Sequence, residues 1–224
     1  MNSLLKLIFP AVGVGLLTFT WSVAIHGSGG VAAFFGVGGA ALAYNLFRLA
    51  GLTAFTLVSF QVLTGPYMSF WEKLYGPGFY RFHAYEGLVA LLFALLHPTL
   101  LYTNLFASGT GILQFTAGYP FTYYFGPIAL LIMILTVSTA ASAVLLRRQF
   151  FQKRWHLIHL ANYLVFLLVF FHSLTIGTDV SPATSALRPL WWFYFLGMIA
   201  GLAYRRIYLP LKVKPATGVM APPS

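Results

Sequence analysis

The chain contains no cysteine and few charged residues. Only 7% of its 224 residues are charged, and no more than three residues in the whole chain are acidic. The absence of cysteine excludes disulfides, iron–sulfur clusters, thiolate ligation of iron and thiol redox chemistry. Because a soluble domain carries roughly 25% charged residues, the scarcity of charge excludes a soluble globular fold.

Long apolar segments make up most of the sequence. Hydrophobic residues account for 59% of the chain, and its mean hydropathy is +0.83. Six segments have about the 20 residues that a helix needs to cross a bilayer, and they predict an all-α integral membrane protein built as a six-transmembrane-helix bundle. The first segment lacks a small-residue cleavage site and is interpreted as a span. The predicted spans are 4–25, 43–64, 82–104, 122–146, 156–177 and 189–208.

The segments between and after the spans complete the predicted organisation. Residues 1–208 form a single transmembrane domain. Residues 27–42 are rich in glycine and alanine and carry no charge, which fits either a loop or a re-entrant segment. Residues 209–224 contain four prolines and no apolar period, which predicts a disordered cytoplasmic tail.

Basic residues are unevenly divided between the two predicted sides of the membrane. Eleven lysines and arginines fall on the side of both termini, and only Arg48 and Arg188 fall on the other. The positive-inside rule therefore predicts cytoplasmic termini and a multi-pass protein of a bacterial or archaeal plasma membrane. The net charge of +10 is then explained by loops near the lipid bilayer, and no nucleic-acid partner is expected.

Four histidines stand at the ends of two apolar runs, HAYEGLVALLFALLH and HLANYLVFLLVFFH. The runs lie in the third and fifth spans, which cross the membrane in the same direction. The 14 residues from His83 to His97 rise by about 21 Å, and the 13 residues from His159 to His172 by about 20 Å. We therefore expect His83 to face His159 near the cytoplasmic side and His97 to face His172 near the outer side. Two facing imidazoles suit haem iron, so this pattern predicts two stacked b-type haems.

The helical phase of the two runs differs. Fourteen residues make nearly four whole turns, whereas thirteen leave His172 roughly 140° from His159 on an ideal helix. The fifth span is therefore expected to contain a π-bulge, a tilt or a kink, unless the two haems lie on different sides of it.

The histidines have other interpretations. Intramembrane histidines also relay protons, so a haem-free proton-coupled transporter or channel is the main alternative, and a structural partner in a larger complex is a third. His83 and Glu86 form an HxxE pattern, which is a weak metal motif and also fits proton shuttling. His156 is expected close to the inner haem or the interface, and His26 in an interfacial loop.

Three arginines are candidates to bind the anionic haem propionates. Arg81 lies two residues before His83, and Arg154 belongs to the basic run before His159. Arg48 lies about one turn inside the second span, where a charge is costly unless it has a partner. Anchoring to the bilayer interface is the alternative for the first two arginines, and snorkelling to headgroups is the alternative for Arg48.

The stretches 79–102 and 147–174 carry a family resemblance. Six spans with two histidines in the third and two in the fifth resemble the ferric reductase-like transmembrane domain superfamily, over about residues 40–208. This superfamily includes ferric-chelate reductases, the NADPH oxidase haem domain and the haem subunit of bacterial methionine sulfoxide reductase systems. Trp155, His159 and His172 are similar to the pattern of the last group. The position of His83 is usually occupied by a basic residue in that group, so a histidine there is more similar to the pattern of the reductases and oxidases.

The resemblance implies transmembrane electron transfer by a di-haem membrane cytochrome b, the haem component of an oxidoreductase. Ferric reductases and oxidases usually continue into a cytoplasmic flavin and NAD(P)H domain, and this sequence holds no such region. Electrons are therefore expected from a flavin or NAD(P)H site on a separate cytoplasmic reductase, or from a membrane quinol. The expected acceptor is a ferric chelate, a periplasmic reductase partner or oxygen.

Overall fold

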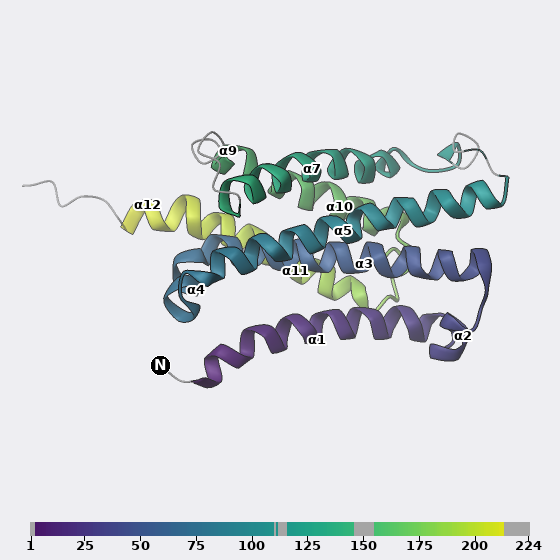
Figure 1. The fold of residues 1–224 in the computed structure, drawn as a ribbon, viewed down its shortest axis with the longest axis horizontal. Coiled ribbons are helices and arrows are strands. Elements are labelled where there is room, and N and C mark those ends of the chain that lie inside the picture. The colour runs from purple at the N-terminus through teal and green to yellow at the C-terminus, as the bar shows by residue number, and fades with distance from the viewer. Residues whose placement is uncertain (1–2, 110, 112–115, 146–154, 213–224) are drawn as a thin grey trace, which may run out of the picture.

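The computed structural model describes residues 3–109, 111, 116–145 and 155–212, and every described element is a helix (Figure 1). Five helical segments are long and apolar enough to cross a membrane, which confirms a helical, multi-pass membrane protein. The expected sixth span coincides with α11 (Leu187–Ala203), a helix of 17 residues that is not among the five. The five candidate spans are Lys6–Gly27, Gly39–Tyr75, Gly78–Phe106, Phe121–Val144 and Leu157–Ile176.

The stretch 27–42 is not entirely a loop. It contains the short helix α2 (Val31–Phe35), which connects α1 (Ser3–Gly27) to α3 (Gly39–Thr64). Gly29 and Gly30 have φ angles of 91° and 95°, a region that residues with a Cβ rarely enter. These two glycines allow the chain to reverse between α1 and α3.

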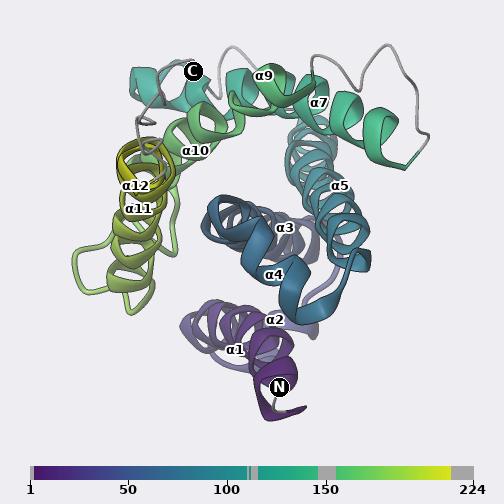
Figure 2. The ribbon, with the colours of Figure 1, turned by 90° about the vertical axis from the view of Figure 1, so that its left-hand side faces the viewer.

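Helix α3 is the centre of the bundle. It packs against α1, α5, α10 and α11, and Figure 2 shows α5, α7, α10 and α11 in an arc around it, with α1 on the opposite side. After α3 come the 3-10 turn η1 (Gly65–Tyr67) and the short helix α4 (Met68–Tyr75). The long helix α5 (Gly78–Ala107) follows and continues through Pro98 without a break.

The second half of the chain adds three further long helical segments, each with a short helix or helical turn next to it. The 3-10 turn η2 (Phe121–Tyr124) leads into α7 (Phe125–Val144), and α9 (Trp155–His159) precedes α10 (Asn162–Ile176). Helix α11 continues through a π-helical turn, η3 (Tyr204–Tyr208), into α12 (Leu209–Lys212). The first four residues of the expected tail are thus helical, and residues 213–224 lie outside the described part of the chain.

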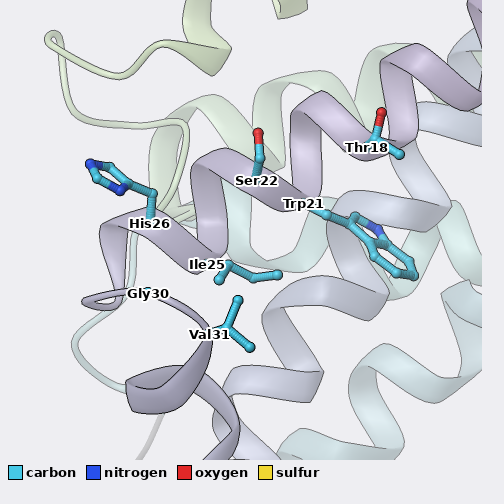
Figure 3. A pocket seen from close by; sticks show the side chains of 7 residues that line it. All are labelled: Thr18, Trp21, Ser22, Ile25, His26, Gly30 and Val31. Carbon is cyan, nitrogen blue, oxygen red and sulfur yellow. The ribbon is translucent and has the colours of Figure 1, made fainter.

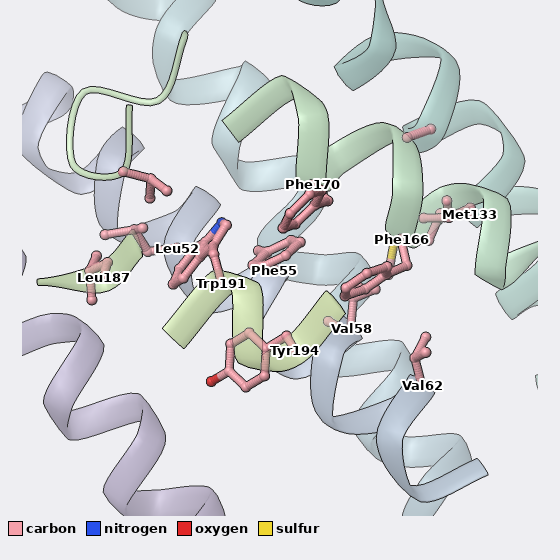
Figure 4. Packing of buried hydrophobic residues seen from close by; sticks show 14 of the residues in the cluster. Leu52, Phe55, Val58, Val62, Met133, Phe166, Phe170, Leu187, Trp191 and Tyr194 are labelled. Carbon is pink, nitrogen blue, oxygen red and sulfur yellow. The ribbon is translucent and has the colours of Figure 1, made fainter. Parts of the chain in front are cut away.

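Aromatic side chains form the core where α3, α10 and α11 meet (Figure 4). Trp191 is fully buried and stacks on Phe55 with ring centroids 4.6 Å apart. Phe55 also stacks on Phe166 at 5.5 Å. The Trp191 indole N–H donates to the hydroxyl of Ser173 at 2.8 Å, so the polar edge of this large ring is also satisfied. This cluster fixes α10 against the central helix.

Candidate metal centre

His83 and His159 face each other between α5 and the end of α9. Their ring centroids lie 6.2 Å apart, and the ring planes make an angle of 70°. Two imidazoles that bind one metal from opposite sides, with metal–nitrogen bonds of about 2.0 Å and about 1.2 Å from nitrogen to ring centroid, have centroids about 6.4 Å apart. His83 Nδ1 is buried and has no hydrogen-bond partner among the described residues. The spacing of the pair therefore fits a shared metal ion.

A break in the helix precedes α10. Helix α9 ends at His159, Leu160 and Ala161 form a turn, and α10 begins at Asn162. The turn is closed by a hydrogen bond from the Ala161 N–H to the Ile158 carbonyl at 3.0 Å. Because His159 and His172 lie on different sides of this break, their relative direction is not set by one helical phase. The break supplies the kind of distortion that the 13-residue spacing requires.

A chain of polar groups supports His159. Its Nδ1 lies 3.0 Å from the amide of Asn162, and that amide is also hydrogen-bonded to the hydroxyl of Thr136 on α7. An asparagine amide presents either its oxygen or its nitrogen to a neighbour. Here the nitrogen faces the ring, so Asn162 Nδ2–H donates to His159 Nδ1, and Asn162 Oδ1 accepts from the Thr136 hydroxyl. This chain fixes the orientation of the His159 ring.

Gln61 and Glu86 lie behind His83. The Gln61 amide N–H₂ of α3 donates to the His83 carbonyl at 2.6 Å and to Glu86 Oε2 at 2.8 Å. Glu86 is buried, with 9% of its surface exposed. Within the described ranges, no group of three or more His, Cys, Asp or Glu side chains is placed to hold a metal ion, so the HxxE pattern is not part of such a cluster.

His97 and His172 are the second expected pair. His97 Nδ1 donates to the Phe47 carbonyl of α3 at 3.0 Å, and the Phe47 ring stacks on the imidazole at 4.2 Å with an interplanar angle of 17°. His172 Nδ1 donates to the Thr122 carbonyl of η2 at 3.2 Å. A carbonyl oxygen only accepts, so both rings carry their proton on Nδ1 when neutral and leave Nε2 free for a metal.

Helices α3 and α7 hold both pairs in place. Each of them packs against α5 and also against α10, the two helices that carry the second pair. All four histidine side chains are half-buried. The two expected pairs of imidazoles lie toward opposite ends of parallel helices, and the helix surface between them is mostly apolar. This arrangement fits two bis-histidine haems.

Residues 50–170 match the family model of the ferric reductase-like transmembrane component, which is more than half of the chain. The chain belongs to the ferric reductase-like transmembrane family. This confirms the resemblance inferred from its histidine pattern. His83, His97 and His159 lie inside the matched region, whereas Arg48 and His172 lie two residues outside its ends. No curated protein and no solved structure gives a significant match.

The three arginines considered for propionate binding have different surroundings in this ferric reductase-like chain. Arg48 pairs through Nε and Nη2 with the carboxylate of Asp179 and donates from Nη1 to the Ser28 hydroxyl at 2.8 Å. Arg81 is exposed on the first turn of α5. Arg154 and the side chain of His156 lie outside the described residues. A propionate contact for any of the three stays a prediction.

His26 lies apart from the two pairs. It belongs to the last turn of α1, not to a loop, and its side chain is exposed. Figure 3 shows it at the edge of a pocket that is also lined by Trp21, Ile25 and Val31. None of the other five histidines lines this pocket.

Sequence reasoning missed the groups that orient the imidazoles. Asn162 was detectable, because it lies one helical turn after His159. Thr136 and Gln61 come from other helices, and their contacts depend on the tertiary structure. The Phe47 and Thr122 acceptors are main-chain carbonyls, which have no signature in a sequence.

Proposed function

We propose that the chain is the membrane haem component of a transmembrane electron-transfer system. In this proposal an inner b-type haem is bound by His83 and His159, and an outer one by His97 and His172. The observation that carries it is the close approach of the half-buried His83 and His159 rings in a chain of the ferric reductase-like family. The haems supply reversible one-electron transfer, and the protein supplies ligands, orientation and an apolar surrounding.

The direction of electron flow follows from the charge distribution. We propose six spans, with α11 as the sixth, and both termini in the cytoplasm, since eleven of 13 basic residues then lie inside. Electrons enter at the inner pair from a separate cytoplasmic flavin or NAD(P)H reductase, or from a quinol, and leave from the outer pair. The acceptor is a ferric chelate, a periplasmic reductase partner or oxygen.

Haem content tests this proposal directly. We expect the purified protein, expressed with adequate haem, to give a pyridine haemochrome of b type with about two haems per chain. The 70° angle between the His83 and His159 planes predicts a highly anisotropic low-spin electron paramagnetic resonance (EPR) signal for the oxidised inner haem, because nearly perpendicular ligands leave two iron orbitals close in energy. A protein without haem would refute the proposal and favour a haem-free proton pathway through the same histidines.

The polar chain behind His159 gives a second prediction. Replacing Asn162 by leucine removes the hydrogen-bond partner of His159 Nδ1 and changes the electron-donating strength of the imidazole. We expect the midpoint potential of the inner haem to shift by up to about 59 mV, a tenfold change for one electron, while the outer potential stays constant. Redox titration followed by optical spectroscopy measures both potentials.

Two threonine variants on α7 test whether the inner potential depends on this hydrogen-bond chain. Thr136→Val removes the next group in the chain and is expected to give a smaller shift in the same potential. Thr139→Val is the matched control, because the Thr139 hydroxyl donates only to carbonyls of its own helix. Equal shifts in the two threonine variants would show that the inner haem does not sense this chain.

A further inference from the structure

Both outer histidines lie against a glycine of a neighbouring element. A Cβ built on Gly51 of α3 would lie 2.6 Å from His97 Nδ1 and 2.8 Å from its Cε1. A Cβ on Gly126 of α7 would lie 2.7 Å from His172 Cε1 and 3.0 Å from its Nε2. Contacts below 3.0 Å essentially never occur for real Cβ atoms, so an alanine at either position would displace the imidazole.

The two glycines occupy the same place relative to the hydrogen-bond acceptor. Gly51 follows Phe47 by four residues, and Gly126 follows Thr122 by four residues. In a helix the Cβ atoms tilt toward the N-terminus, so the side chain at position i+4 lies over the carbonyl of residue i. A glycine at i+4 leaves this carbonyl uncovered, and its second lone pair is then open to a donor from another helix.

We propose that Gly51 and Gly126 are positioning residues for the outer haem. Each leaves a bare patch of helix backbone on which one imidazole rests while its Nδ1–H donates to the carbonyl four residues earlier. The patch fixes the ring orientation and the tautomer with Nε2 free. This inference deepens the proposed function and rests on it for the identity of the bound group.

The inner pair is held in a different way. Among the described glycines, only Gly51 and Gly126 would bring a Cβ against a histidine. Gly87, one turn after His83 on α5, would meet only Gln61, at an ordinary distance of 3.6 Å. The glycine and the carbonyl therefore recur together at both outer ligands and at neither inner one, which is the pattern expected if they serve the outer site.

The first test measures bound haem. Gly51→Ala and Gly126→Ala are each expected to weaken outer haem binding by about 10- to 100-fold and to leave the inner haem in place. Haemochrome assays and EPR spectra of the purified variants should show loss of the outer haem alone. Gly15→Ala on α1 is the matched control, because a Cβ there meets nothing within 4 Å. Two unchanged haems in both variants would overturn the inference.

The second test works with or without haem. The stability of Gly51→Ala is compared with that of His97→Ala and of the double variant, and the same cycle is run for Gly126 and His172, by thermal unfolding in detergent. If each glycine accommodates an imidazole, the alanine should destabilise the wild-type background and have little effect once the histidine is gone. A single variant that does not fold should then be rescued in the double variant.

The outcomes separate the two proposals. Equal destabilisation by the alanine in both backgrounds would overturn the positioning role, whatever the haem content. Absence of haem from the wild-type protein would refute the proposed function, while a coupled result in the cycle would still establish the contact between glycine and histidine. A coupled result together with selective loss of the outer haem supports both.

Discussion

Replacing His97 or His172 by alanine should remove about half of the bound haem and leave the other half spectroscopically unchanged. In the proposal these two imidazoles form a pair of their own, and their hydrogen bonds go to the Phe47 and Thr122 carbonyls, which neither inner histidine contacts in the described hydrogen bonds. Loss of either ligand therefore breaks one site without touching the other. Haemochrome assays and EPR on the purified variants give the count and identity of the remaining haem.

The same variants should separate entry of electrons from their exit. With the outer haem absent, the inner haem is still reduced by the cytoplasmic donor, but its reoxidation by an acceptor outside the membrane is slowed. His26→Ala is the control, because this exposed side chain lies apart from both pairs. If His97→Ala and His172→Ala lost both haems in equal measure, or lost none, the assignment of ligands to pairs would be wrong.

Replacing Arg48 by methionine should destabilise the protein by about 3–5 kcal/mol. The Arg48 and Asp179 side chains are only 14% and 10% exposed, and they join α3 to the segment between α10 and α11. Removing the guanidinium leaves the largely buried Asp179 carboxylate without its counter-charge, which is the costly half of a broken ion pair. Thermal unfolding in detergent measures the loss.

A paired variant distinguishes this mechanism from simple loss of packing. In Arg48→Met with Asp179→Leu, no unpaired charge remains, so most of the stability should return. Arg188→Met is the matched control on the same side of the membrane, since Arg188 donates to the Ser181 carbonyl and makes no ion pair among the described residues. A double variant as unstable as Arg48→Met would contradict a role for the unpaired carboxylate.

Much of the architecture was predictable because the bilayer imposes simple rules. Apolar length predicted four of the five candidate spans to within four residues, whereas the second continues to Tyr75, and helical rise predicted that His83 would meet His159. The break before α10 was expected only in general terms, since Leu160 and Ala161 are ordinary helix formers and the turn arises from tertiary packing. The partner of Arg48 was not foreseen, because Asp179 lies 131 residues away.

The outer histidines are hydrogen-bonded to main-chain carbonyls, whereas His159 is hydrogen-bonded to a side chain, and this difference affects how the two sites respond to substitution. A main-chain carbonyl is present whichever residue is encoded at position 47 or 122, so point substitutions there leave the acceptors of the outer ligands in place. The hydrogen-bond partner of His159 is a side chain, and single substitutions at Asn162 or Thr136 alter it. Divergence among related sequences can thus change the environment of the inner ligands while that of the outer ligands stays nearly constant.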